Sequence, residues 1–195
     1  MTRPESFFAA VDAAWEPPVP GKTTLRIIGA SALALQTGYD RGSQDADVLE
    51  SAEIPPERRE SLLALAGEKT ALAQRTGLYL QFVPPGLPFL PQKPSFHGVP
   101  SLASLRRLDV QVLDVADVVV SKLKPFRRRD ITDIKAMADA GALDPNHLLA
   151  RLRAAIDWYE LDARAEKDLP RIIKNFHIVQ RDFLAVPETY FDQED

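Results

Sequence analysis

Apolar residues recur along the chain with two periodicities, one typical of β-strands and the other of α-helices. Short apolar or alternating runs bounded by turn residues predict strands, and we expect them at residues 25–28, 45–49, 77–83 and 108–113. Apolar residues three or four positions apart predict helices, and we expect these at residues 6–15, 31–36, 55–75, 117–123, 130–141, 145–161 and 168–184. Gly67 is a candidate break in the long third helix.

Prolines mark several ends of these elements. The cluster at residues 17–21 stops the first helix, and the five prolines of residues 84–94 exclude that stretch from a central ladder. The order of elements predicts an α/β (α+β) fold, with a small mixed sheet flanked by helices and followed by a C-terminal helical part. We expect one domain over residues 1–140, with the helices of residues 141–195 packed on it and not independent.

Composition narrows the chemistry available to the protein. The chain has no cysteine, which excludes disulfides, thiolate zinc sites and a cysteine nucleophile, and this favours a cytoplasmic location. The three histidines, His97, His147 and His177, are not spaced as metal ligands. No stretch approaches the ~20 apolar residues of a membrane helix, so we expect no membrane partner. The net charge of −4 does not by itself indicate a nucleic-acid binder.

Two aspartates on the second predicted strand form the first candidate site. Residues two apart on a strand project from the same face, so Asp45 and Asp47 hold their carboxylates together while Ala46 faces the other way. Magnesium prefers one or two carboxylates together with substrate phosphates and water. The pair therefore predicts a Mg²⁺ (or Mn²⁺) site. Two aspartates near a turn are more often solvated or capping groups, so a structural role stays open.

A small-residue turn follows the first predicted strand. Gly29 permits a tight turn, and Ser31 is expected to cap the helix that follows. A helix N-terminus favours phosphate, so we expect nucleotide binding at Gly29, Ala30 and Ser31. Arg41, in the loop before the acid pair, is a further candidate phosphate contact.

The order of these pieces resembles the first motif of the DNA polymerase beta superfamily of nucleotidyltransferases. The matching residues are Ile28-Gly29-Ala30-Ser31 and, after a helix, Asp45-Ala46-Asp47, with Ala30 standing where glycine or serine is common. Residues 119–134, with Lys122 and Arg129-Asp130-Ile131-Thr132-Asp133, resemble the lysine and Arg-Asp-x-x-Asp motifs of the AbiEii-like and MenA-like toxin nucleotidyltransferases and of related uncharacterised bacterial nucleotidyltransferases. The resemblance covers about residues 25–140 and leaves the C-terminal helices unassigned.

The resemblance implies a reaction and a set of roles. It implies transfer of a nucleoside monophosphate from a nucleoside triphosphate to an acceptor hydroxyl, with tRNA 3′ ends the acceptors of some members and an antitoxin protein a further partner. Asp45 and Asp47 would be catalytic metal ligands, and Lys122 and Asp130 catalytic residues. A third carboxylate commonly completes the superfamily's metal site, and Asp109 is the best candidate by position, with Asp114 a weaker substitute.

Each of the later residues also has a structural interpretation. Asp130 and Asp133 suit the N-cap and first turn of a helix, where an acidic group contributes about 1 kcal/mol. Lys122 suits an amphipathic helix that lifts its ammonium group to solvent. The basic run Arg127 to Arg129 is either an ordinary solvated run or a contact for the phosphate backbone of RNA.

Three functions remain open from the sequence. The first is an active nucleotidyltransferase, either a housekeeping enzyme or a toxin held inactive by an antitoxin. The second is a catalytically inactive nucleotide- or RNA-binding module of the same fold, which a missing third carboxylate would favour. The third is an α/β protein whose aspartate pair only caps a turn.

Overall fold

The computed structural model describes residues 1–191 and separates into two compact units. The first unit comprises Met1–Pro88 and Ser95–Asp114, and the second comprises Phe89–Pro94 and the chain from Val115 onward. The expected domain boundary at residue 140, with C-terminal helices that do not fold independently, stays a prediction. Residues 192–195 of the expected C-terminal part lie outside the described chain.

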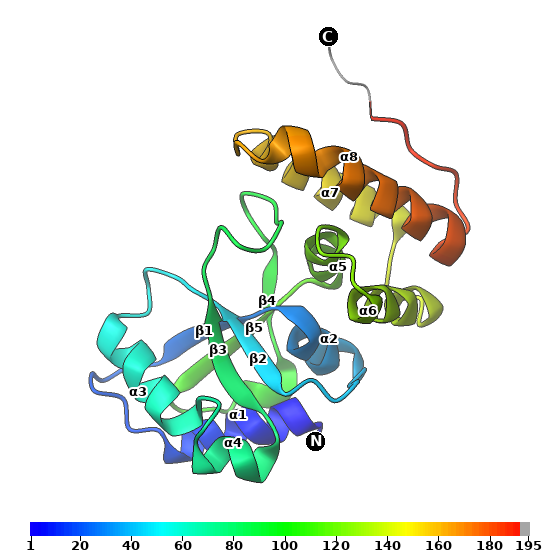
Figure 1. Cartoon of the computed structure of the whole chain (residues 1–195). Helices are drawn as coiled ribbons and strands as arrows, with labels where there is room; N and C mark the ends of the chain where they lie inside the picture. Colours follow the sequence, from blue (N-terminus) through cyan, green and yellow to red (C-terminus); the bar gives the residue numbers. More distant parts are fainter. Residues whose placement is uncertain (192–195) are drawn as a thin grey trace. The chain divides into compact units, whose positions relative to one another are not determined.

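The first unit is a five-stranded mixed sheet with helices (Figure 1). Its elements are α1 (Arg3–Ala14), β1 (Thr23–Ile27), α2 (Gly29–Thr37), β2 (Asp45–Leu49), α3 (Pro56–Ala66), α4 (Ala71–Thr76), β3 (Tyr79–Val83), β4 (Phe96–Gly98), the short 3₁₀ helix η1 (Pro100–Leu102) and β5 (Leu108–Leu113). The strands lie in the order β3-β2-β1-β5-β4. The pairs β1/β5 and β2/β3 are parallel, whereas β1/β2 and β4/β5 are antiparallel. This arrangement confirms the predicted mixed sheet.

The two faces of the sheet differ in polarity because side chains alternate along each strand. One face carries the apolar residues Leu25, Ile27, Ala46, Val48, Leu80, Val110 and Val112, all of which are buried. Together with the buried residues of the helices, such as Phe7, Phe8 and Val11 of α1, they form the core of this unit. The opposite face carries the half-buried or exposed polar residues of the four longer strands: Thr24, Arg26, Asp45, Asp47, Tyr79, Gln81, Asp109 and Gln111. We call this the polar face.

One candidate feature of the sequence is confirmed, and one element was missed. The long helix expected at residues 55–75 is divided into α3 and α4 at the candidate break, because the chain leaves the helix at Gly67 and Thr70 then caps α4 by accepting a hydrogen bond from the Ala73 N–H at 3.2 Å. Strand β4 was not expected. It has only three residues, too few to display an alternating pattern, and it is defined by its antiparallel pairing with β5.

The second unit is helical (Figure 1). It contains α5 (Val115–Leu123), α6 (Arg128–Asp139), α7 (Pro145–Tyr159), α8 (Ala165–Ile178) and a π-helical turn, η2 (Val179–Phe183). The fully buried Asp117 of α5 accepts two hydrogen bonds from Arg151 of α7, at 2.7 and 2.8 Å, and Arg151 also donates to the Lys93 carbonyl at 2.9 Å. Among residues 1–191, no helix has the length and apolar character that a membrane crossing requires.

Candidate active site

The acid pair lies on the polar face of β2, beside the end of β1. Asp45 and Asp47 are half-buried, and Ala46 between them is buried in the core. The Ile28 N–H donates to the Asp47 carbonyl oxygen at 2.9 Å, which continues the antiparallel pairing of β1 and β2 up to the turn at Gly29. The two carboxylates therefore share a face at the end of the sheet where α2 begins.

Gly29 is required at this turn for two reasons. Its φ of +66° lies in the left-handed region, which strains any residue with a Cβ atom. A Cβ atom at this position would also lie 3.0 Å from the Asp47 Oδ2 atom. The turn therefore leaves room for the Asp47 carboxylate directly against the backbone at the start of α2.

The Ser31 side chain forms a hydrogen bond between α2 and β2 instead of capping the helix. Helix α2 begins at Gly29 with Ile28 as its N-cap, and no side chain caps it. Ser31 is the third residue of the helix and is 3% exposed, and its hydroxyl donates to the Asp45 carbonyl oxygen at 2.9 Å. The expected serine cap is thus wrong, since the turn at Gly29 starts the helix two residues earlier. The side-chain bond instead fixes the helix N-terminus beside the acid pair.

A loop over residues 38–44 leads into the acid pair and is held by residues that the sequence did not point to. The Ser43 hydroxyl donates a hydrogen bond to the Asp45 carboxylate. Arg3 of α1 donates to both carboxylate oxygens of Asp40, at 3.0 and 3.1 Å, and to the Ser43 carbonyl oxygen at 2.5 Å. Arg41 lies half-buried in the same loop. Arg3 is distant from this loop in sequence, so no local pattern could have revealed its role.

The strand register does not bring Asp109 to the acid pair. Asp109 pairs with Thr24, four residues before Ile28 along β1, which corresponds to about 13 Å of strand. Its carboxylate accepts hydrogen bonds from Thr24 at 3.2 Å and from Gln111 at 2.9 Å. It also lines a pocket of about 270 Å³ together with Lys22 and Leu102. Among residues 1–191, no three histidine or acidic side chains gather closely enough to hold a metal ion.

Lys122 and Asp130 belong to the second unit, where they bind each other. The Lys122 ammonium lies 3.2 Å from Asp130 Oδ1 and 2.8 Å from Asp133 Oδ2. The Lys122 side chain is only 8% exposed and Asp133 is fully buried. Asp130, in the first turn of α6, also accepts from the Arg127 N–H at 2.9 Å. Helix α6 begins two residues before the expected start, so Asp130 is its third residue and not its N-cap, and Asp133 lies beyond the first turn. The two contacts also keep Lys122 from lifting its ammonium group to solvent as expected.

Two polar residues of β3 stand beside the acid pair and were not singled out from the sequence. Tyr79 is the register partner of Asp45, and Gln81 is the register partner of Asp47. Partners in a parallel pair point to the same face, so both side chains lie on the polar face. Burial, followed by the charges of Asp45, Glu68 and Asp47, raises the pKa of the Tyr79 phenol. The alternation of polar and apolar residues at positions 79–82 was the available signal.

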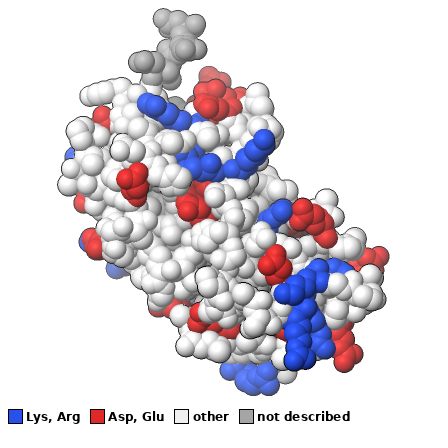
Figure 2. Space-filling view, turned by 180° about the vertical axis from the view of Figure 1, so that it is seen from behind, with Lys and Arg blue, Asp and Glu red and all other residues white. Residues whose placement is uncertain are grey.

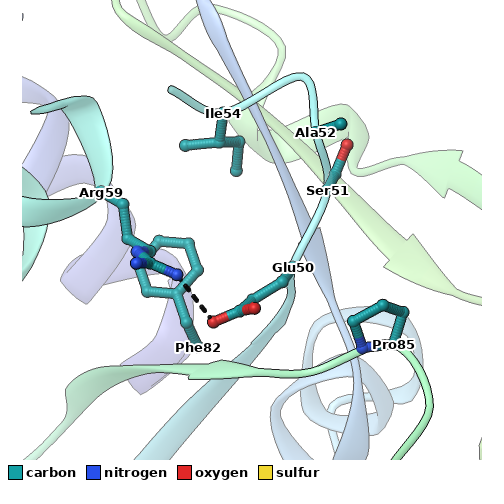
Figure 3. A pocket seen from close by; sticks show the side chains of 7 residues that line it. All are labelled: Glu50, Ser51, Ala52, Ile54, Arg59, Phe82 and Pro85. Carbon is teal, nitrogen blue, oxygen red and sulfur yellow. Dashed lines mark hydrogen bonds and ion pairs between the residues drawn. The ribbon is translucent and has the colours of Figure 1, made fainter. Parts of the chain in front are cut away.

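A second pocket lies beyond the other end of β2. It encloses about 270 Å³ and is lined by Glu50, Ser51, Ala52, Ile54, Arg59, Phe82 and Pro85 (Figure 3). An ion pair of 3.0 Å joins Arg59 to Glu50 at its wall. Phe82 alternates with Gln81 along β3, so it points away from the polar face. This pocket is therefore separate from the acid pair and its turn.

Comparison with known proteins identifies one matching family. Its description is "Nucleotidyltransferase of unknown function (DUF6036)", and the match covers residues 18–182. That range includes both the Gly29 turn and the acid pair. No curated protein and no solved structure matches the chain.

Proposed function

Because the chain belongs to this family of nucleotidyltransferases, we propose that it transfers a nucleoside monophosphate from a nucleoside triphosphate to an acceptor hydroxyl. One observation carries the proposal: the Asp47 carboxylate lies against Gly29, where a positive φ turns the chain into α2. Two carboxylates thereby stand beside the free N–H groups of a helix N-terminus. The carboxylates suit a cation and the N–H groups suit phosphate, so the two together suit a metal-bound triphosphate.

The donor set fits Mg²⁺, and Mn²⁺ shares its preference for oxygen ligands. Asp45 and Asp47 would hold the ion, and the space at Gly29 that a Cβ atom would fill leaves Asp47 accessible from the turn. When bound, the ion supplies neutralisation of phosphate charge and polarisation of a phosphoryl oxygen. Two carboxylates leave most coordination positions to phosphate and water, as magnesium requires.

Other residues of the first unit bind the phosphates and position the acid pair. The N–H groups of Gly29, Ala30 and Ser31 bind the terminal phosphates at the positive end of α2. Ser43 orients the Asp45 carboxylate, and the bond from Ser31 to the Asp45 carbonyl keeps α2 in place. The acceptor oxygen then attacks the α-phosphorus in line: the new O–P bond forms, the bond to the bridging oxygen breaks, pyrophosphate leaves, and the acceptor's proton passes to water.

RNA is the acceptor that we favour. Arg127, Arg128 and Arg129 are all exposed, and such a segment can contact a phosphate backbone. The face drawn in Figure 2 intersperses acidic side chains with basic ones, so the proposal rests on this local segment and not on a broad basic surface. A toxin role with an antitoxin partner is a further part of the proposal. It predicts that a neighbouring gene encodes a protein that silences the transfer.

A second candidate function is a nucleotide-binding module without catalysis. The observation that favours it is that, among the described residues, no three histidine or acidic side chains gather closely enough to hold a metal ion. Such a module would bind a triphosphate at the same turn but would release no pyrophosphate. Catalysis therefore distinguishes the two functions.

The experiment is transfer of label from each α-labelled nucleoside triphosphate to total RNA in the presence of Mg²⁺. Asp45→Asn and Asp47→Asn are expected to abolish transfer, whereas Asp109→Asn, on the same face but about 13 Å farther along the sheet, retains it. All three variants should unfold at the wild-type temperature. Full activity in both Asp45→Asn and Asp47→Asn would refute the site, and triphosphate binding without transfer by the wild type would select the binding module.

A further inference from the structure

The acid pair has different neighbours on its two sides. Strand β2 lies between β1, which ends at the Gly29 turn, and β3, which is an edge strand of the sheet. On the polar face, Tyr79 stands beside Asp45 and Gln81 beside Asp47. Tyr79 is half-buried, and Gln81 is exposed. The face therefore presents, in order across the strands, a phosphate-binding turn, two carboxylates, and then an aromatic ring with an amide.

In-line displacement assigns a role to each side. The attacking oxygen and the leaving oxygen lie on opposite sides of the phosphorus. In the proposed function, pyrophosphate leaves toward the turn at Gly29 to Ser31, which lies on the β1 side of the acid pair. The acceptor must then approach from the side that faces away from β1. Tyr79 and Gln81 are the polar side chains of the strand on that side.

The character of this side indicates which part of an acceptor fits. The side chains of β3 on this side are a phenol and an amide, and neither is a cation that would bind a phosphate group. They suit a neutral, flat group that stacks on the phenol ring and hydrogen-bonds to the amide, which describes an unpaired nucleobase at the end of a strand.

We propose that Tyr79 and Gln81 form the acceptor subsite and hold the unpaired terminal nucleoside of a single-stranded RNA end. This inference rests on the proposed function and names the substrate group that the β3 side of the site recognises. Tyr79 stacks on the terminal base, and Gln81 hydrogen-bonds to its edge or to its ribose. The 3′-terminal hydroxyl is thereby positioned over the acid pair.

The test measures KM separately for the triphosphate and for a short single-stranded RNA with a free 3′ hydroxyl. Tyr79→Ala is expected to raise the KM for the RNA roughly five- to a hundredfold, the range that loss of one stacked base produces, with the KM for the triphosphate within about twofold. Tyr79→Phe keeps the ring and restores most of the affinity. Gln81→Ala raises the KM for the RNA less. A blunt RNA duplex, whose terminal base is paired, is a poor acceptor for the wild type.

Gln111→Ala is the matched control, because Gln111 is a glutamine on the same polar face but on β5, beyond β1. It should change neither KM. Thermal unfolding of every variant separates a lost subsite from a lost fold, and Tyr79→Phe answers the question if Tyr79→Ala does not fold.

The outcomes separate this inference from the proposed function. If the wild type transfers label to RNA but Tyr79→Ala changes only the KM for the triphosphate, the subsite is refuted and the transferase stands. Labelling of a protein in place of RNA likewise overturns the nucleoside subsite alone. A wild type that transfers nothing and binds no triphosphate refutes both.

Discussion

The Lys122 ammonium lies 2.8 Å from the carboxylate of Asp133, a completely buried residue of α6. Asp130 makes a second contact with the same ammonium at 3.2 Å. A lysine that is expected from the sequence to reach solvent is therefore the counter-charge of a buried acid. Removal of Lys122 takes a positive charge away from a fully buried carboxylate.

Lys122→Ala should accordingly lower the free energy of unfolding by about 3–5 kcal/mol, the usual cost of removing one partner of a buried ion pair. Urea denaturation measures this. Lys135→Ala is the control, since Lys135 forms an exposed pair with Asp139 at 2.6 Å and should lose at most ~0.5 kcal/mol. Equal losses in the two variants would contradict a buried role for Lys122.

Gly29→Ala should impair nucleotide transfer much more than Gly38→Ala. Both glycines have positive φ, +66° and +75°, so both substitutions strain the backbone at a cost of about 1 kcal/mol. Only at Gly29 does the added Cβ atom meet the Asp47 carboxylate, at 3.0 Å, whereas nothing lies within 4 Å at Gly38. Similar melting temperatures with a selective loss of transfer in Gly29→Ala are expected. Equal activities would show that the turn does not position Asp47.

Asp12→Asn should destabilise the protein in a pH-dependent way. Burial raises the pKa of Asp12, but hydrogen bonds from the Arg106, Arg107 and Leu108 N–H groups, at 3.0, 2.7 and 2.8 Å, outweigh burial and lower it from its ordinary 3.8. A lowered folded pKa means that the carboxylate stabilises the fold fully above the ordinary value, and that this stabilisation is lost as pH falls through the folded value.

The difference in unfolding free energy between wild type and Asp12→Asn should therefore be full near pH 7, at about 1–3 kcal/mol, and should shrink below about pH 4. Denaturation series at several pH values measure it. A difference that stays constant down to pH 2 would exclude the carboxylate charge as its source.

Arg3→Ala should slow nucleotide transfer although Arg3 lies outside the acid pair. Its guanidinium holds Asp40 and the Ser43 carbonyl, and Ser43 in turn orients Asp45. Loss of this support should reduce kcat/KM roughly ten- to a hundredfold, as misplaced catalytic groups do. Hydrogen exchange of residues 40–44 should rise in parallel. Arg164→Ala, which removes an exposed pair with Asp162 at 2.6 Å, is the control for a lost surface arginine.

The elements with long or regular patterns could be predicted from the sequence. Residues 45–49 and 108–113 were expected as strands and form β2 and β5 with the same bounds. Their alternating burial follows directly from the period of two along a strand. The position of Gly29 at a positive φ was likewise readable, because a tight turn after a buried strand favours glycine.

Other features depend on information that the local sequence does not contain. Strand register decides that Asp109 stands opposite Thr24 and not at the end of β1, and register is set by pairing between distant segments. The burial of Lys122 depends on α6 packing against α5, although its acidic partners are close in sequence. The ion pair between Arg3 and Asp40 is a tertiary contact that joins α1 to the loop after α2.

Residues Phe89–Pro94 belong to the second unit but lie in the sequence between the two segments of the first unit, and this affects how the chain folds during synthesis. These six residues leave the ribosome before β4 and β5, yet their partners belong to α7. Phe89 packs edge-on against Tyr159 at 5.2 Å between ring centroids, and the Lys93 carbonyl oxygen accepts a hydrogen bond from Arg151. The sheet can form as soon as β5 emerges from the ribosome, whereas Phe89 cannot pack until α7 has been synthesised. A nascent chain in which β5 has emerged from the ribosome but α7 has not should thus display a complete sheet with an apolar loop exposed to chaperones.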